Sequence, residues 1–286
     1  MATTITNRAN LRYTYGAVTE TVASNLASTV LNDPLTATKS SLETAYRNGE
    51  DLTYVITMTN GSDVTLTDVT IVDDLGTYTA SGVSVTPLTY KGPAQLFFDG
   101  VFSSVLEPVV LENSAAFTIP QLQPGRTATI LYKATPNEYA PMTPDAEITN
   151  TAAFSPAASV QPVTATHTIP VDQYASVSID KEMTPNPITD GAALVNTFTI
   201  TNTGNVEATD LVLTDTFMTP LENVTVTIDG TPVPAGSFTY EQNLLTLPVG
   251  TQTPLSVPAA TFTQDPTTGV VSIVPGVTTV VVTGNI

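Results

Sequence analysis

A lysine, an aspartate and an asparagine of this 286-residue chain could form an isopeptide bond if they meet in its interior. Strand periodicity places Lys39, Asp73 and Asn150 on the same faces as their apolar neighbours, so all three side chains should point into a core. Burial lowers the pKa of a lysine and raises that of an aspartate, which leaves a neutral amine beside a protonated carboxyl. That amine could attack the asparagine amide carbon and release ammonia.

The same three residues also fit a purely structural role. Burying an unpaired charge is costly, so a buried lysine and a buried aspartate are expected to pair with each other. The asparagine would then serve as their hydrogen-bond partner, and no covalent bond would form. The two hypotheses differ in whether the lysine amine lies within reacting distance of the asparagine amide carbon. Asp74 follows Asp73 on the strand and is expected to face solvent.

An internal repeat supplies a second, incomplete set of the same residues. The interval from Lys181 to Asp215 equals the interval from Lys39 to Asp73. The second repeat contains no counterpart of the strand that carries the first asparagine, but the segment around Asn7 resembles that strand. Asn7 precedes the first lysine by nearly the same interval as the first asparagine precedes the second lysine. The two repeats are therefore offset by one strand: the strand that would complete the second repeat lies at the N-terminus of the chain, around Asn7.

The phase shift predicts that one copy of the chain completes another. A sandwich without its last strand exposes an apolar groove and unpaired backbone groups, which favour the addition of a strand from a neighbour. Head-to-tail contacts of this kind make a filament, or a ring if the rotation closes. Asn7 of one subunit would then meet Lys181 and Asp215 of the next and could form a covalent bond between subunits. The face expected to enter the groove carries Ile5, Asn7, Ala9, Leu11 and Tyr13.

Two other arrangements of the N-terminal segment remain open. It could be an ordinary frayed terminus, or it could fold back onto the second domain of its own chain and close the monomer. Residues 1–19 contain Arg8 and Arg12 and no acidic residue, whereas the whole chain has a net charge of −18. This contrast could steer the segment toward another subunit, an effect that salt would weaken.

The pattern along the whole chain predicts an all-β protein with two Ig-like antiparallel β-sandwich domains and an N-terminal donor-strand arm. Runs of Thr, Val and Ile alternate with period two and are interrupted by Gly, Pro, Asn and Asp. The expected boundaries are a donor-strand arm at 1–33, a complete sandwich at 34–158, a linker at 159–171 and an acceptor sandwich at 172–286.

Composition excludes several classes of function. The chain has no cysteine, which rules out disulfides and thiol chemistry, and its acidity would repel nucleic acid and anionic membranes. His167 is the only histidine, and the aspartates lack the spacing of a calcium-binding loop. We therefore expect no metal, no cofactor and no enzymatic activity beyond autocatalytic bond formation.

The first residues lack the charged and apolar regions of a secretory signal, and no run of about eighteen apolar residues could span a bilayer. We expect either that the protein is made without such a signal or that a signal has been removed.

Several short motifs occur in order along the chain, namely Gly49–Tyr54, Thr59-Asn60, Thr67–Val69, Val72–Leu75, Pro124-Gly125 and Ile148–Ala152. At these motifs the chain resembles the bacterial Ig-like "conserved repeat domain" family, domain of unknown function eleven. Members of this family occur in cell-surface and extracellular proteins, so the resemblance implies a scaffold or adhesion role and a surface location. The size and the two repeats also resemble subunits of clostridial spore appendages.

The sequence thus predicts a structural subunit that polymerises with itself into an extracellular or spore-surface fibre, with an anchor or tip protein as a further partner. The alternative is an adhesive or ligand-binding module pair from a larger surface protein. Its binding loops would lie at 85–110 or 228–265.

Overall fold

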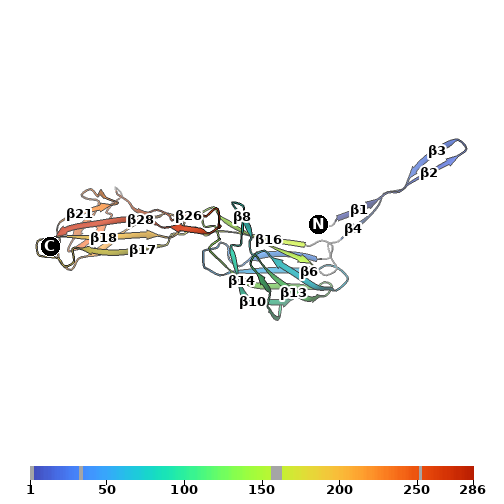
Figure 1. Ribbon diagram of the computed structural model, residues 1–286, viewed down its shortest axis with the longest axis horizontal. Helices are drawn as coiled ribbons and strands as arrows, with labels where there is room; N and C mark the ends of the chain where they lie inside the picture. The colour runs from blue at the N-terminus through green and yellow to red at the C-terminus, as the bar shows by residue number, and fades with distance from the viewer. Residues whose placement is uncertain (1–2, 32–34, 156–162, 251–252) are drawn as a thin grey trace.

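The computed structural model describes residues 3–31, 35–155, 163–250 and 253–286, and every regular element in these ranges is a β-strand (Figure 1). The predicted fold class, all-β with Ig-like antiparallel sandwiches, is confirmed. Figure 1 shows an N-terminal arm at one end, a first sandwich in the middle and a second sandwich at the other end. The predicted boundaries at 33/34 and 158/159 fall outside the described residues.

The first sandwich, residues 35–170, consists of two five-stranded sheets and a small hairpin. One sheet has the order β11 (Val101–Leu106), β10 (Leu88–Phe98), β14 (Thr127–Pro136), β6 (Leu52–Asn60), β5 (Leu35–Ser41). The other has the order β12 (Val109–Leu111), β13 (Ser114–Leu122), β7 (Leu66–Asp73), β15 (Glu147–Ser155), β16 (Val163–Pro170). The hairpin consists of β8 (Tyr78–Ala80) and β9 (Val83–Val85).

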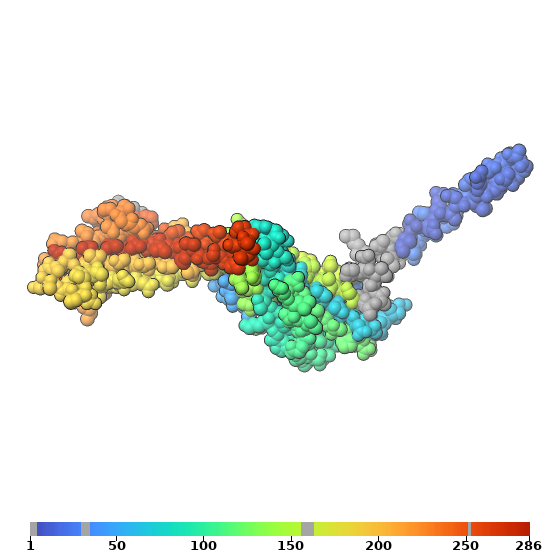
Figure 2. Space-filling model, in the orientation of Figure 1, coloured from blue at the N-terminus to red at the C-terminus, as the bar shows by residue number. Residues whose placement is uncertain are grey.

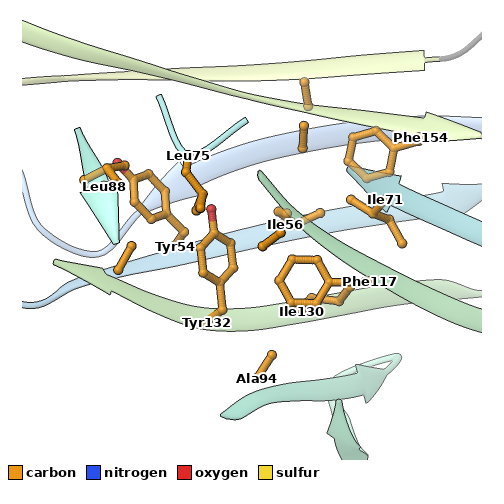
Figure 3. Packing of buried hydrophobic residues seen from close by; sticks show 14 of the residues in the cluster. Tyr54, Ile56, Ile71, Leu75, Leu88, Ala94, Phe117, Ile130, Tyr132 and Phe154 are labelled. Atoms are coloured by element: carbon orange, nitrogen blue, oxygen red, sulfur yellow. The ribbon is translucent and has the colours of Figure 1, made fainter. Parts of the chain in front are cut away.

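Alternating side chains of the two sheets fill the core of this sandwich. Burial follows the two-residue period closely along β6 and β14, so one face of each strand points inward. Figure 3 shows the rings of Phe117, Tyr132 and Phe154 and the side chain of Ile71 packed between the sheets. Between β13 and β14 the chain reverses at Gly125, whose φ of 71° favours glycine.

The second sandwich, residues 177–286, has a counterpart of the sheet that contains β5 and β6, but only part of the sheet that contains β7 and β15. Its five-stranded sheet has the order β17 (Val177–Thr184), β18 (Ala193–Asn202), β28 (Gly276–Asn285), β21 (Glu222–Ile228), β22 (Thr231–Pro232). Opposite it lie β20 (Leu213–Thr216), β24 (Leu244–Leu247), β23 (Thr239–Glu241) and the pair β19 (Ala208–Leu211) and β25 (Leu255–Val257). A further hairpin consists of β26 (Thr261–Gln264) and β27 (Val271–Val274).

Matching the two sandwiches by their repeated residues shows which strands the second one lacks. Lys39 pairs with Ile56 across β5 and β6, and Lys181 pairs with Phe198 across β17 and β18, so β17 is the counterpart of β5. By the same match β19 and β20 together correspond to β7, and Asp215 on β20 corresponds to Asp73. The described part of the second sandwich contains no counterpart of either β15 or β16. The deficit is therefore two strands, whereas the sequence predicted one.

The prediction of a linker at 159–171 is wrong for most of that segment. Residues Val163–Pro170 form β16, which pairs with β15 from Phe154↔Val163 to Glu147↔Pro170. The alternation of apolar and polar residues in this segment is weak, but β15 needs a neighbour at its outer edge, and β16 supplies the backbone partners. The first sandwich therefore extends to the start of the second.

The arm is a two-stranded hairpin rather than the single strand that was predicted. It contains β1 (Thr3–Asn7), β2 (Asn10–Tyr15), β3 (Val18–Ala23) and β4 (Ala27–Leu31). β1 pairs with β4 and β2 with β3, and the chain turns at Gly16, which has a φ of 58°. Every arm side chain from Ile5 to Thr29 is exposed, so none is covered by the rest of its own chain.

The two sandwiches adjoin each other in the space-filling view of Figure 2, and side-chain hydrogen bonds join them. The amide of Asn205 donates to the backbone oxygens of Met142, at 3.3 Å, and Asp172, at 2.8 Å. On the other side of the joint, the amide of Gln264 donates to the Tyr78 hydroxyl at 2.6 Å. These contacts place the second sandwich as a continuation of the first, with the arm at the opposite end.

We expect Phe117→Ala to lower the free energy of unfolding of the first sandwich by about 3–5 kcal/mol, because it removes a buried ring and leaves a cavity. Urea denaturation of the whole chain would measure the change. The matched control is Val101→Ala on the exposed strand β11, which should change stability by no more than about 0.5 kcal/mol. Equal losses in the two variants would contradict this description of the core.

Candidate functional site

The structure brings the first predicted set of residues together inside the first sandwich. The Nζ atom of Lys39, on β5, lies 2.6 Å from Oδ2 of Asp73, on β7, and both side chains have no exposed area. The other carboxylate oxygen of Asp73 accepts a hydrogen bond from the backbone N–H of Leu75 at 3.0 Å. The two opposing sheets thus supply the lysine and the carboxylate separately.

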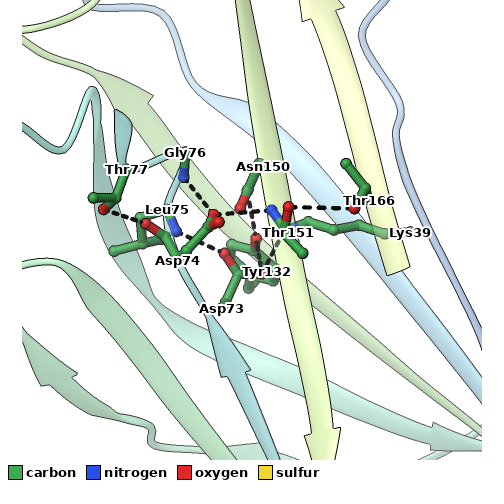
Figure 4. Close-up of polar contacts among 10 residues, drawn as sticks. All are labelled: Lys39, Asp73, Asp74, Leu75, Gly76, Thr77, Tyr132, Asn150, Thr151 and Thr166. Carbon is green, nitrogen blue, oxygen red and sulfur yellow. Dashed lines mark hydrogen bonds and ion pairs between the residues drawn. The ribbon is translucent and has the colours of Figure 1, made fainter. Parts of the chain in front are cut away.

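Tyr132 connects this pair to the asparagine. Its hydroxyl, on β14, donates to Oδ2 of Asp73 at 2.6 Å and accepts from Nδ2 of Asn150, on β15, at 3.1 Å. The Oδ1 atom of Asn150 is buried and has no hydrogen-bond partner among the described residues. Figure 4 shows the three side chains and Lys39 converging between the sheets.

Aromatic rings surround the lysine amine. The Nζ atom of Lys39 lies 5.2 Å from the ring centroid of Tyr54 and 6.0 Å from that of Tyr132. Burial lowers the pKa of Lys39, although the neighbouring Asp73 acts in the opposite direction. Burial also raises the pKa of Tyr132 well above its ordinary value, so its hydroxyl keeps its proton and can serve as a donor.

The prediction that Asp74 faces solvent is wrong. Its carboxylate is half-buried and accepts hydrogen bonds from the backbone N–H groups of Gly76 and Thr151, both at 2.9 Å. Burial raises the pKa of Asp74. Because Thr151 follows Asn150 on β15, this contact fixes the strand that carries the asparagine. Asp74 is therefore a positioning residue for the site.

The sequence did not identify Tyr132 and Tyr54 as part of this site. Both lie on inward faces of strands, where a tyrosine usually signals core packing. The one available signal is that a buried tyrosine hydroxyl needs a polar partner. That partner could not be named before β14, β7 and β15 were placed together.

The second predicted set is brought together only in part. The Nζ atom of Lys181 lies 2.6 Å from Oδ2 of Asp215, but their side chains are 34% and 17% exposed. The amine also lies 5.1 Å from the ring centroids of Phe198 and Phe217. Lys181 and Asp215 thus lie as close together as Lys39 and Asp73, but their side chains are partly exposed instead of buried.

Asn7 does not reach Lys181 within one chain. It lies on β1, exposed, and pairs across the hairpin with Ala27 on β4. The other residues predicted to enter a groove, Ile5, Ala9, Leu11 and Tyr13, are exposed as well. All five predicted donor residues are thus in the arm, at the opposite end of the molecule from the second sandwich (Figure 1).

The two tyrosines of the first site are replaced in the second sandwich. Strand register puts Asn196 at the position of Tyr54 and Val282 at the position of Tyr132. Asn196 is buried, and neither of its amide atoms has a hydrogen-bond partner among the described residues. The second site therefore lacks the hydroxyl that links carboxylate and asparagine in the first.

The described residues hold no group of three or more His, Asp or Glu side chains suited to a metal ion. The same part of the chain has no helix that is long and apolar enough to cross a bilayer.

No protein-family model and no curated protein matches the chain. Among solved structures it is similar to BcpA, the major pilin subunit of Bacillus cereus, with 13% identity and a TM-score of 0.39 over 93% of this chain and 77% of that one. In another structure of this pilin the chain covers 64% of the length, which is less than two thirds.

Two further solved structures are similar at the same level. Domains D2 and D3 of the major pilin SpaD from Corynebacterium diphtheriae are 11% identical, with a TM-score of 0.34 over 84% of this chain and 88% of that one. A collagen-binding domain from a Staphylococcus aureus adhesin is 14% identical, with a TM-score of 0.31 over 46% of this chain and 95% of that one. At these values the likeness does not extend to partners or site residues.

We expect Tyr132→Phe to lower the free energy of unfolding by about 1–3 kcal/mol, because it leaves the buried Asn150 carboxamide without its partner and removes a donor from Asp73. Urea denaturation would measure this loss. Tyr90→Phe is the matched control, since the Tyr90 hydroxyl is also buried but has no hydrogen-bond partner among the described residues. The hydroxyl bridge would be disproved if Tyr132→Phe were as stable as the control.

Proposed function

We propose that this protein is a structural subunit that assembles head-to-tail into a homopolymeric fibre outside the cell. The observation that carries the proposal is a pair of complementary defects. The second sandwich has an uncovered inward face and an open strand edge, and the arm has the sequence of a β15-like strand but no cover from its own chain. A strand donated by a neighbour would satisfy both.

The exposure of equivalent residues measures the first defect. Leu35, at the start of β5, is 1% exposed, whereas its counterpart Val177 on β17 is 44% exposed. Ile179 and Met183, farther along the same face of β17, are 52% and 56% exposed. This face is apolar and would be buried if the missing strands were present.

We further propose that isopeptide bonds reinforce the fibre, since the chain has no cysteine. Within the first sandwich, a proton of the Lys39 ammonium would pass to Asp73 along their 2.6 Å contact. The neutral Nζ would then attack Cγ of Asn150 and form a C–N bond, and the Cγ–Nδ2 bond would break. The leaving nitrogen would take up the proton that the attacking amine gives up and depart as ammonia, and Asp73 would keep the proton that it first received from the ammonium.

The same reaction would join Lys181 of one copy to Asn7 of the next, with Asp215 as the carboxyl group. Lys181 and Asp215 are already in contact in the single chain, so the arrival of the arm would supply only the asparagine. Polymerisation and bond formation would therefore be coupled, because the second site is complete only in the fibre.

The location and the family are part of this proposal. The motifs that resemble the conserved repeat domain family favour a bacterial cell surface, and the two-repeat organisation favours the narrower case of a spore appendage. An anchor or tip protein would be needed to begin or end such a fibre. Apart from its own crosslinking, we propose no enzymatic activity.

A second candidate function is adhesion, and an exposed apolar surface favours it. The predicted binding segment 85–110 is mainly the hairpin β10–β11 and not a loop, and it borders β12. Six hydrophobic residues at this edge have half or more of their surface exposed, and such patches mark interaction surfaces. A chain that stays monomeric at every concentration would favour this function. The six residues are Val101, Phe102, Val105, Val109, Val110 and Leu111.

We expect purified, assembled protein to form a ladder on a boiled denaturing gel, with bands whose intact masses are short by one ammonia for each bond. Asn7→Ala should abolish the ladder and leave monomers short by one ammonia. Asn150→Ala should retain the ladder and lose only the bond within the first sandwich.

The matched control for Asn7→Ala is Asn10→Ala, which lies on the same side of the hairpin but on its opposite face and should keep the ladder. A monomer of full mass would remove isopeptide bonds from the proposal. Electron microscopy of the same undenatured sample would then decide whether fibres form without them.

We expect the internal bond to form faster as the pH rises and to reach a plateau above the folded-state pKa of Lys39. The reactive amine is neutral, and burial lowers that pKa, so the plateau should begin below the pH at which an ordinary lysine titrates, about 10.4. Lys181→Arg protein isolated in denaturant before it has folded, and therefore of full mass, would be refolded at a series of pH values, and intact mass at timed intervals would give the rate. A rate that falls with rising pH would contradict attack by the neutral amine.

A further inference from the structure

The opening in the second sandwich is two strands wide. In the first sandwich β15 pairs with β7, β16 pairs with β15, and β16 also lies against β5. The Ser41 hydroxyl of β5 and the ring Nε2 of His167 on β16 are 3.0 Å apart. Since the described part of the second sandwich has neither strand, both β20 and β17 lack the neighbour that their counterparts have.

The arm has the same design as the missing pair of strands. Asn150 on β15 lies opposite His167 on β16, and Asn7 on β1 lies opposite Ala27 on β4. In both cases two antiparallel strands run out and back, and the second strand leads directly into the next sandwich. The arm therefore offers two strands in the order and direction that the second sandwich lacks.

One face of the arm hairpin is largely apolar and uncovered. Leu11 lies opposite Val22, and Tyr15 lies opposite Val18, so these side chains share a face with Tyr13. All five are between 41% and 63% exposed. The other face carries Thr and Arg side chains, so the hairpin is amphipathic and has one side suited to a sandwich interior.

A buried polar side chain in the second sandwich also lacks the partner that a second strand would bring. Asn196 is fully buried and makes no hydrogen bond to the described residues through its amide. Its counterpart Tyr54 meets the His167 ring edge-on, with 6.3 Å between ring centroids, so this position faces β16. An unsatisfied buried amide is costly, and a strand at the β16 position is placed to satisfy it.

From these observations we propose that the complete arm hairpin of a second copy, and not a single strand, fills the second sandwich. β1 and β2 take the place of β15, and β3 and β4 take the place of β16. The inference rests on the proposed function and specifies the contact between subunits. Arg8 and Arg12 outnumber Glu20 in the hairpin, which favours its approach to a chain of net charge −18.

The first sandwich sets the register of this contact. Ala152 on β15 lies opposite Asp73 on β7, so Ala9 of the arm is placed opposite Asp215 on β20. Asn10 then faces Thr214. On the other strand of the hairpin, Ala27 takes the place of His167 and so lies next to Met183, the counterpart of Ser41.

The test uses cysteine pairs, which report without interference because the chain has no cysteine. Full-length chains with Ala27→Cys are mixed with chains carrying Met183→Cys, both in a Lys181→Arg background that prevents covalent ladders. After assembly, a short bismaleimide links neighbouring thiols. A docked hairpin should yield mixed dimers at least about tenfold above the control, because docking gives the two thiols a high effective concentration.

The control replaces Met183→Cys with Glu182→Cys, which lies next to it on the opposite, outward face of β17. A second pair, Asn10→Cys with Thr214→Cys, reports the arrival of the first strand alone. Peptide mass spectrometry confirms which thiols are joined, and each single-cysteine chain by itself measures random linkage.

Links in both pairs support the hairpin. A link only between positions 10 and 214 overturns the hairpin but keeps the proposed function, since one strand would then be donated. Fibres without either link overturn strand donation altogether, and a chain that remains monomeric overturns both the fibre and the hairpin. A chain carrying both Ala27→Cys and Met183→Cys that links only within the monomer also overturns the proposal, because the arm would then fold back on its own chain.

Discussion

Backbone groups at a sheet edge need hydrogen-bond partners, and apolar side chains on a sheet face need to be shielded from water. The two sandwiches of this protein differ in how far they meet this requirement. The first sandwich meets it internally, because β15 and β16 complete one sheet and close over β5. The second sandwich repeats the rest of the architecture without these two strands. Every residue of its β17 is exposed, although the inward-facing positions of β5, which are Leu35, Ala37, Lys39 and Ser41, are partly or fully buried. The open domain thus differs from the closed one above all by the absence of this strand pair.

The same cover determines the electrostatics of the two lysine–aspartate pairs. Both have Nζ and Oδ2 atoms 2.6 Å apart, so each ion pair forms without help from the missing strands. In the first sandwich the pair is sealed by β15 and by two tyrosine rings, and burial lowers the pKa of Lys39. In the second sandwich water still reaches the pair. Lys39 therefore has the desolvated environment that favours a neutral amine, whereas Lys181 in the single chain does not.

Differences between the two sites fit this division. Tyr132 and Tyr54 fill the first site, and the Tyr132 hydroxyl connects Asp73 to Asn150 within a single chain. Asn196 and Val282 stand in their places in the second sandwich, and the Asn196 amide has no partner among the described residues. The second site is therefore less filled by side chains of its own chain than the first.

The sequence by itself determined the strand faces, the repeat and the identity of the residues that meet. Period two is a local property, so it placed Lys39 and Asp73 inward before any contact was known, and equal spacing identified Lys181 and Asp215 as their counterparts. Only the tertiary structure decided that β16 belongs to the first sandwich, that the arm is a hairpin, that Asp74 is half-buried and that Tyr132 bridges the site. Each of these depends on which strands become neighbours across long stretches of chain. The alternation of side chains says which face is inward, but not what covers it.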